Sequence, residues 1–276
     1  MRTIVLGSGP MGRAVAAGLE GRGDDVTVLG RPRSTHPPGA FDGIDVVFDF
    51  SRGDGVLPNL ASGLAGGCRR YVVGTTAWTA GPVKIGAILA QYGAAAVAAA
   101  NFSPGVNMLA RLVESASYLF GPLPAYDPYV VEWHRRGKAD RPSGTALELS
   151  RRILAAHPGK ARIADHARPG AAEADELEVS SVRAGSSPGM HVVGFDAPGE
   201  TLELRLTARD RSAYVLGALA AADWLAEEPR RPGLHGFDEV VDQLVGLPGT
   251  DPSSAPLRRG TGRAGRRMDP VAVPMA

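Results

Sequence analysis

Residues 2–20 have the sequence RTIVLGSGPMGRAVAAGLE, in which an apolar run ends in three closely spaced glycines. The apolar run predicts a buried strand, and the segment after the glycines predicts a helix. Gly7, Gly9 and Gly12 fit the pattern G-x-G-x-x-G at the turn between them. Glycines there allow a tight turn, close approach of a pyrophosphate, and close packing of the helix on the sheet. The stretch therefore predicts a dinucleotide-binding domain.

The rest of the first hundred residues continues this alternation. Further strands are expected at 26–29, 45–50, 71–73 and 95–99, and several of them are apolar throughout, as in a parallel sheet covered on both faces. Helices are expected between them, at 11–22, 55–65 and 82–92. Strand–helix–strand units of this spacing predict right-handed crossovers and a Rossmann-type parallel sheet.

Ligands of such sheets bind where the carboxyl ends of the strands meet. The free N–H groups at the start of the first helix suit the cofactor phosphates. The loops after the other strands are expected to hold the rest of the cofactor. The expected cofactor-binding residues are Gly7, Ser8, Gly9, Pro10, Met11, Gly12, Arg31, Phe50, Ser51, Gly74, Thr75, Thr76, Ala100, Asn101 and Phe102.

The end of the second strand predicts the type of cofactor. NAD-specific sites usually place a carboxylate there to bind the ribose hydroxyls. This chain instead has Gly30-Arg31-Pro32-Arg33. Since guanidinium groups attract a 2′-phosphate, NADPH is expected, with NADH possible; solvent-facing arginines are the alternative interpretation.

The second half of the chain has a different pattern. Helices are expected at 106–120 and 143–156, a strand at 129–133, and antiparallel strands across 176–208, where hydrophobicity alternates in period two. This predicts a second, α+β domain with a mixed or antiparallel sheet. We expect 1–102 with 212–247 to form the dinucleotide-binding domain, 103–211 to bind substrate and mediate oligomerisation, and 248–276 to be a disordered tail.

Composition excludes several classes of protein. The 276 residues carry a net charge of +1, which gives no support to nucleic-acid or membrane-surface binding. No run approaches the length of a membrane span. The single cysteine excludes an internal disulfide and a multi-cysteine metal site, and no metal ligand set is expected. These features favour a cytoplasmic protein that acts on a small molecule.

The densest polar cluster is the segment 132–146, EWHRRGKADRPSGTA. Its end, PSGT, precedes a predicted helix and supplies hydroxyls and backbone N–H groups for an anion such as a substrate carboxylate. Lys138 is one of three lysines in a chain that otherwise uses arginine. A lysine can donate a proton where an arginine cannot, and His134 could be a second acid or a carboxylate ligand.

This segment resembles the substrate-site motif of the 4-hydroxy-tetrahydrodipicolinate reductase (dihydrodipicolinate reductase) family, E-x-H-H-x-x-K-x-D-x-P-S-G-T-A. The resemblance extends over residues 1–246. It includes, in order, DVVFDFS (45–51), VVGTT (72–76), ANFSPGVN (100–107), SVRAG (181–185) and GETLEL (199–204).

The resemblance implies roles for particular residues. His134 and Lys138 match the residues associated with protonation, and are the expected catalytic pair. The expected substrate-binding residues are Arg135, Ser143, Gly144, Thr145 and Arg211. The resemblance also implies a homotetramer and NAD(P)H-dependent reduction of 4-hydroxy-tetrahydrodipicolinate to tetrahydrodipicolinate in lysine and diaminopimelate biosynthesis.

The chain departs from the family pattern at several positions. Arg135 replaces the motif's second histidine, Trp133 replaces a smaller residue, and Pro10 stands where a basic residue is usual; Met190 and Leu206 also differ. These departures keep open a second hypothesis, a divergent member that reduces another cyclic imine or enamine. A third hypothesis is a non-catalytic dinucleotide sensor, which would need the glycine loop but not Lys138.

Overall fold

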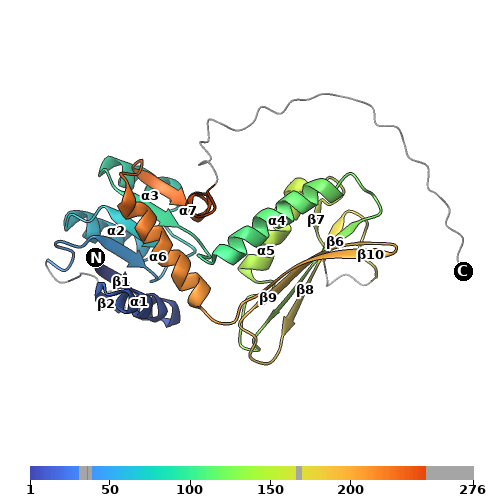
Figure 1. The fold of residues 1–276 in the computed structure, drawn as a ribbon, viewed down its shortest axis with the longest axis horizontal. Helices are drawn as coiled ribbons and strands as arrows, with labels where there is room; N and C mark the ends of the chain where they lie inside the picture. Colours follow the sequence, from blue (N-terminus) through green and yellow to red (C-terminus); the bar gives the residue numbers. More distant parts are fainter. Residues whose placement is uncertain (31–35, 37–38, 166–169, 247–276) are drawn as a thin grey trace, which may run out of the picture.

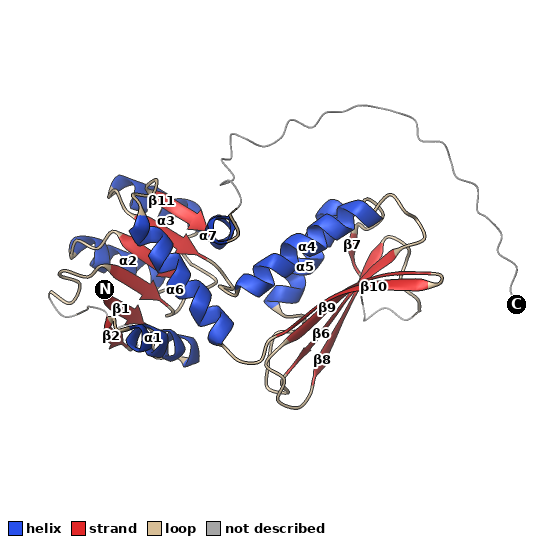
Figure 2. Ribbon diagram, in the orientation of Figure 1, coloured by secondary structure: helices blue, strands red, loops and turns tan. Residues whose placement is uncertain are grey.

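The computed structural model describes residues 1–30, 36, 39–165 and 170–246. These residues form two sheets, each packed against helices, which make up two halves of the molecule (Figures 1 and 2). This confirms the predicted combination of a Rossmann-type parallel sheet and a second α+β unit. No helix among the described residues is long and apolar enough to cross a membrane.

The first sheet has six parallel strands in the order β11-β5-β4-β3-β1-β2. The chain moves outward from β1 in both directions, so the strand order reverses between β1 and β3. In open α/β sheets a ligand binds at such a switch point, at the carboxyl edge. The strands are β1 (Arg2–Leu6), β2 (Asp25–Leu29), β3 (Val46–Asp49), β4 (Arg70–Val73), β5 (Ala95–Ala98) and β11 (Gly233–Gly236).

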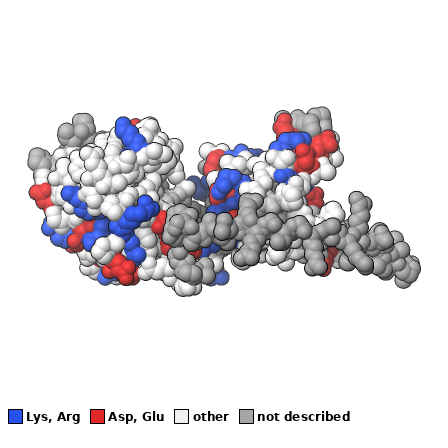
Figure 3. Space-filling model, turned by 90° about the horizontal axis from the view of Figure 1, so that it is seen from above, with Lys and Arg blue, Asp and Glu red and all other residues white. Residues whose placement is uncertain are grey.

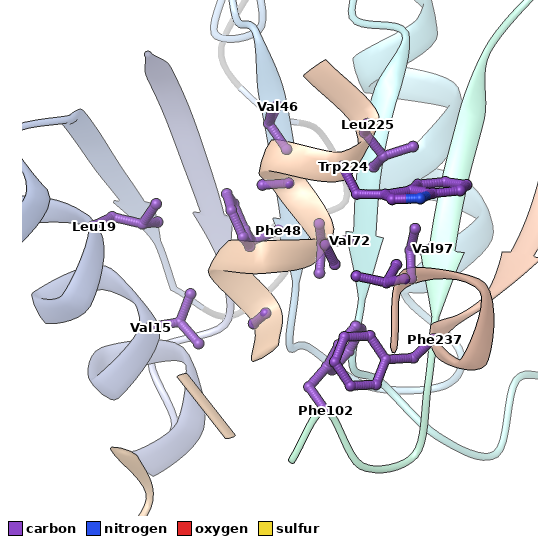
Figure 4. Packing of buried hydrophobic residues seen from close by; sticks show 14 of the residues in the cluster. Val15, Leu19, Val46, Phe48, Val72, Val97, Phe102, Trp224, Leu225 and Phe237 are labelled. Atoms are coloured by element: carbon purple, nitrogen blue, oxygen red, sulfur yellow. The ribbon is translucent and has the colours of Figure 1, made fainter. Parts of the chain in front are cut away.

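Helices cover both faces of this sheet. One apolar cluster joins it to α1 (Pro10–Arg22), α6 (Ser212–Glu227) and α7 (Phe237–Leu244). The other joins it to α2 (Val56–Ala65) and α3 (Pro82–Gln91). Figure 4 shows α6 lying over the strands, with Phe102 and Phe237 in contact at one end of the cluster. The helices after residue 211 therefore complete the first half of the molecule.

The second sheet is mixed and has the order β10-β9-β6-β8-β7. Helices α4 (Pro104–Phe120) and α5 (Gly144–Ala156) pack together on its inner face around a separate apolar cluster. The strands are β6 (Asp127–His134), β7 (Arg162–Ile163), β8 (Glu176–Arg183), β9 (Met190–Ala197) and β10 (Glu200–Thr207).

The expectation of antiparallel strands across 176–208 is correct for β9 and β10 but wrong for β8. Strand β8 pairs in parallel with β6, and β6 separates it from β9. The connection 184–189 crosses the end of β6, where the Ala184 N–H donates to the carbonyl of His134 and Ser187 accepts from the Arg135 N–H. Period-two alternation identifies the strands, but it does not specify their partners. The short strands β7 and β11 were not predicted.

The chain crosses between the two halves at 99–103 and at 208–211 (Figure 1). The second crossing begins next to the connection over β6, because the N–H of Ala208 donates to the carbonyl of Gly189 over 2.8 Å. A hydrogen bond therefore links the connection that crosses the carboxyl end of β6 to the segment that leads into α6.

Candidate active site

The three glycines of the first loop have different steric roles. A Cβ at Gly7, where φ is +106°, would lie 2.3 Å from the carbonyl oxygen of Phe50. A Cβ at Gly12 would lie 1.9 Å from the carbonyl oxygen of Gly7. At Gly9 a Cβ would meet no atom of the described residues within 4 Å. The first and third glycines are thus required by the protein's own packing, whereas the second borders open space.

That open space lies at the amino end of α1. Gly9 is the N-cap and Pro10 follows it, and no side chain caps the helix. Ser8 is exposed and Met11 is half-buried beside them. The N–H groups of a helix's first turn have no partner inside the helix, and they carry a partial positive charge. The residues present therefore fit the pyrophosphate of a dinucleotide.

The loops after β3 and β4 are tied together by Asp49, a buried residue that the sequence did not single out. Its carboxylate accepts hydrogen bonds from the hydroxyls of Ser51 (2.6 Å) and Thr75 (2.8 Å) and from the side-chain amide of Asn59 (2.9 Å). The expected cofactor-binding side chains of Ser51 and Thr75 are therefore already bonded within the protein. Their hydrogen bonds to Asp49 fix the conformation of the loops after β3 and β4.

Three aromatic residues pack together at the same edge of the sheet. The rings of Phe50, Phe102 and Tyr214 contact one another edge to face. Gly74 permits this packing, since its Cβ would lie 2.0 Å from the Phe50 ring. The Phe102 side chain is fully buried, so it belongs to the core.

The remaining expected cofactor residues lie at the same carboxyl edge. Thr76 and Ala100 are exposed, and Asn101 is half-buried, with its side-chain oxygen accepting from the Ser103 N–H over 2.9 Å. Arg31 lies outside the described residues.

A second polar group lies at the end of β6. Glu132 and His134 are two residues apart and share the inner face of the strand. Ser181 on β8 and His191 on β9 are the register partners of Glu132, so these side chains form a row across three strands. Arg183 is the register partner of His134.

The Glu132 carboxylate is fully buried and joins the members of this group. Its Oε1 atom accepts from the backbone N–H of Ser143 (2.9 Å), the hydroxyl of Ser181 (2.7 Å) and the guanidinium of Arg183 (2.7 Å). Its Oε2 atom lies 2.7 Å from Nδ1 of His134. Burial opposes ionisation of Glu132, but the hydrogen bonds from Ser143, Ser181 and Arg183 outweigh it and lower its pKa to about 2.

The two histidines of the group are close and buried. Their ring centroids are 5.1 Å apart, and Nε2 of His191 lies 3.3 Å from the Ser143 hydroxyl. Burial lowers the pKa of His134, and it lowers that of His191 to about 4. Both rings are therefore neutral at neutral pH.

Lys138 supplies a cation beside these neutral rings. Its ammonium pairs with Asp140 over 2.8 Å, and that bond lowers the pKa of Asp140. The positive charge of Lys138 also contributes to the lowered pKa of His134 and of His191, which places it within electrostatic range of both. The two expected catalytic residues are thus close enough for the charge of Lys138 to act on the His134 ring.

The PSGT turn at the start of α5 is partly occupied by the protein itself. Ser143 is buried, its hydroxyl accepts from the Ala146 N–H as the helix cap, and its own N–H binds Glu132. Gly144 is exposed and Thr145 is half-buried. The second hydroxyl, on Thr145, is therefore better placed for a ligand than the first.

The two expected substrate-binding arginines are both exposed. Arg135 follows β6, and Arg211 is the N-cap residue of α6, at the second crossing between the halves. Figure 3 shows Lys and Arg side chains beside the hollow between the two halves. Trp133, by contrast, is on the outer face of β6, away from Glu132 and His134, and its indole N–H donates to the carbonyl of Ala184. This departure from the family pattern therefore does not alter the polar group.

A divalent metal can be bound by side chains of the kind found in Glu132, His134 and His191. The potential ligand atoms of these three residues lie within 4.8 Å of one another. However, the guanidinium of Arg183 is already bound to Glu132, and the charge of Lys138 acts on both histidines. Two neighbouring cations disfavour a dication at this position. The donor set fits proton chemistry better.

Sequence reasoning missed the partners of His134. Glu132 was quoted only as part of a motif, and Ser181, Arg183 and His191 were given no role. The spacing of Glu132 and His134 places both on one face of a strand and could have identified the first partner. The others depend on the pairing of β6 with β8 and β9, which is a tertiary property.

Known proteins resemble this chain in sequence. The model of the family described as "Dihydrodipicolinate reductase, C-terminus" matches residues 105–241. The 4-hydroxy-tetrahydrodipicolinate reductase of Myxococcus xanthus is 37% identical over 203 residues, which cover 71% of this chain and 72% of the relative. That of Wolinella succinogenes is 34% identical over 218 residues, which cover 74% and 83%.

A solved structure shares the fold. The dipicolinate-bound dihydrodipicolinate reductase from Paenisporosarcina sp. TG-14 superposes with a TM-score of 0.63 at 20% identity, covering 86% of this chain and 97% of the other.

Proposed function

The chain belongs to the 4-hydroxy-tetrahydrodipicolinate reductase family, and on that premise we propose that it reduces 4-hydroxy-tetrahydrodipicolinate, in its dehydrated conjugated form, to tetrahydrodipicolinate. This reaction belongs to lysine and diaminopimelate biosynthesis. The observation that carries the proposal is the place of Lys138 in the short segment between His134, at the end of β6, and the amino end of α5, with its ammonium held by Asp140.

The cofactor fits the first half of the molecule. The open space at Gly9 and the uncapped end of α1 suit the pyrophosphate, and the loops after β3, β4 and β5 continue the same edge. When bound, the reduced nicotinamide supplies hydride to an electrophilic ring carbon of the substrate. The loops fixed by Asp49 form the wall against which the ring would lie.

The second half holds the substrate and supplies the proton. The Lys138 ammonium donates a proton to the carbon next to the one that is reduced, and its charge acts on the His134 ring. The N–H groups and the Thr145 hydroxyl at the start of α5 hold one carboxylate. Arg135 and Arg211 are placed to attract the other. A positioned acid typically contributes a rate factor of roughly 10²–10⁴.

The test is NADPH oxidation with substrate generated enzymatically in the cuvette, comparing the wild-type protein with Lys138→Ala. We expect kcat to fall by about 10²- to 10⁴-fold, with little change in the KM for NADPH. Lys84→Ala is the matched control, because this lysine lies on α3, in the first half of the molecule. A wild-type protein that does not turn over this substrate would favour the divergent-member hypothesis, and full activity in Lys138→Ala would remove that residue from the proton step.

We further propose a preference for NADPH over NADH. It rests on the absence of a carboxylate in residues 30–33 and on the two arginines there. The ratio of kcat/KM for the two cofactors measures it, and Arg31→Ala should move that ratio toward NADH.

We also propose a division into domains, an oligomeric state and a location in the cell. The separate apolar cluster of the second half supports a division into 1–102 with 212–247 and 103–211. A homotetramer, for which the uncovered Trp133 and Val182 on the outer face of the sheet offer a contact surface, is testable by light scattering. We place the protein in the cytoplasm.

A further inference from the structure

The buried pair Glu132 and His134 has a feature that the proposed reaction does not by itself explain. Oε2 of Glu132 and Nδ1 of His134 lie 2.7 Å apart, and both are completely enclosed. Neither atom has another hydrogen-bond partner among the described residues. Since buried polar atoms are nearly always paired, each is the only group that can satisfy the other.

The carboxylate is held firmly from its other side. Three donors, on β8 and at the amino end of α5, bind Oε1, and they keep Glu132 ionised. An ionised carboxylate can only accept a hydrogen bond. The proton of the neutral His134 ring must therefore be on Nδ1, and Nε2 carries the lone pair.

The other ring nitrogen has a different environment. Nε2 of His134 makes no hydrogen bond to the described part of the chain, and only the absence of a side chain at Gly189 leaves space beside it, since a Cβ there would lie 3.0 Å from Nε2. Gly189 lies in the connection between β8 and β9, and its carbonyl accepts from the Ala208 N–H at the start of the second crossing. Nε2 is thus the atom of His134 that remains available to a substrate.

We propose that Glu132 is a positioning residue that holds the proton of His134 on Nδ1, so that Nε2 faces the substrate as a hydrogen-bond acceptor. This inference rests on the proposed function and deepens it, because it gives the two catalytic residues different roles. Lys138 is the proton donor, and neutral His134 orients a donor group of the substrate or the Lys138 ammonium itself. The arrangement resembles other sites in which a carboxylate fixes the tautomer of a histidine.

The variant Glu132→Gln gives a sharp test. The three donors around Oε1 require an oxygen there, so the side-chain amide nitrogen of Gln takes the position of Oε2. An amide nitrogen donates, so Nδ1 becomes an acceptor and the proton moves to Nε2. The substitution should therefore invert the tautomer of His134 and leave the residue in place.

The readout is the ¹⁵N spectrum of histidine-labelled free protein at about pH 8, above the usual titration range of histidine. The His134 signals are identified by their loss in His134→Asn. We expect protonated Nδ1 and bare Nε2 in the wild type, and the reverse in Glu132→Gln, with kcat lowered by roughly 10- to 100-fold and the KM for NADPH little changed. Glu203→Gln, which removes the same charge from β10 where Glu203 binds Tyr129, is the matched control and should keep the wild-type tautomer.

A wild-type spectrum with the proton on Nε2 would overturn the inference, and this measurement remains decisive if Glu132→Gln does not fold. A second variant, Ser181→Ala, removes one donor but keeps the carboxylate, so it should preserve the tautomer. Because the spectra need no substrate, failure of this inference is distinguishable from failure of the proposed reaction, which the turnover assay reports.

Discussion

The amino ends of α1 and α5 were both predicted as anion sites, and the structure shows that they differ. At α1 the cap is a glycine without a side-chain cap, and among the described residues nothing fills the space beside it. At α5 the Ser143 hydroxyl caps the helix and the Ser143 N–H binds a buried glutamate. The first end is left free for a large ligand, whereas the second uses part of its hydrogen-bonding capacity to hold the residues that surround the substrate.

The largest effect is expected at the glycines of α1. Gly12→Ala places a Cβ against the carbonyl oxygen of Gly7, a backbone atom that cannot move without opening the turn. We expect a loss of stability of about 1–3 kcal/mol or more, together with loss of dinucleotide binding. Thermal unfolding and titration with NADPH measure the two effects.

Gly9→Ala is the matched control for this end of α1. Its Cβ meets no protein atom within 4 Å, so the free energy of unfolding should fall by less than about 1 kcal/mol. NADPH affinity should nevertheless fall by roughly 10-fold or more, because the new methyl group occupies the approach of the pyrophosphate. Unchanged affinity would show that the phosphates do not pass over Gly9.

The next prediction concerns stability in acid, which should depend on His191, the histidine next to the Ser143 hydroxyl at the amino end of α5. The pKa of His191 is about 4 in the folded protein and 6.5 ordinarily, so the unfolded chain takes up a proton first as the pH falls. Stability should therefore decrease between about pH 6.5 and pH 4, by on the order of 3 kcal/mol from this residue. His191→Asn should flatten the dependence, measured by urea unfolding at several pH values.

His235 provides a control of opposite sign. Its hydrogen bond to Glu239 raises its pKa, so its contribution is complete below its ordinary pKa and is lost as the pH rises through the raised value. His235→Asn should therefore remove a gain in stability that occurs as the pH falls from the raised value to about 6.5, and it should leave the acid loss below pH 6.5 as steep as in the wild type. Equal slopes in both variants would contradict the assignment.

The smallest effects are expected from removing the two hydroxyls of the PSGT turn, those of Ser143 and Thr145. Ser143→Ala removes the cap of α5 and should cost about 1 kcal/mol of stability. Thr145→Ala should change stability by less than about 0.5 kcal/mol but raise the KM for the substrate by roughly 10-fold, since it removes a hydrogen bond to a carboxylate. If Ser143→Ala changes only KM, the roles are reversed.

The sequence allowed the first half of the fold to be predicted almost completely, because buried parallel strands and their helices are local patterns with clear boundaries. Strand β11, with the sequence GLHG, has no such pattern and is recognisable only by its pairing with β5. The parallel pairing of β8 with β6 was also inaccessible, since alternation marks a strand's faces but not its neighbour.

The candidate site shows the same limit. His134, Lys138 and the PSGT turn were found because they are close in sequence. Asp49 and His191 were not, because their importance depends on which side chains the fold brings to them. A buried carboxylate that binds the loops after two strands cannot be distinguished, by sequence alone, from any polar residue at the end of a strand.

The most direct test of the account is a structure of the protein with NADPH and dipicolinate bound together. We expect the nicotinamide at the carboxyl edge between β1 and β4, with its reactive carbon roughly 3–3.5 Å from the ring of dipicolinate. We also expect one carboxylate at the start of α5 and the Lys138 ammonium within hydrogen-bond reach of the ligand. Dipicolinate bound away from α5, or an ammonium of Lys138 turned into solvent in that complex, would contradict it.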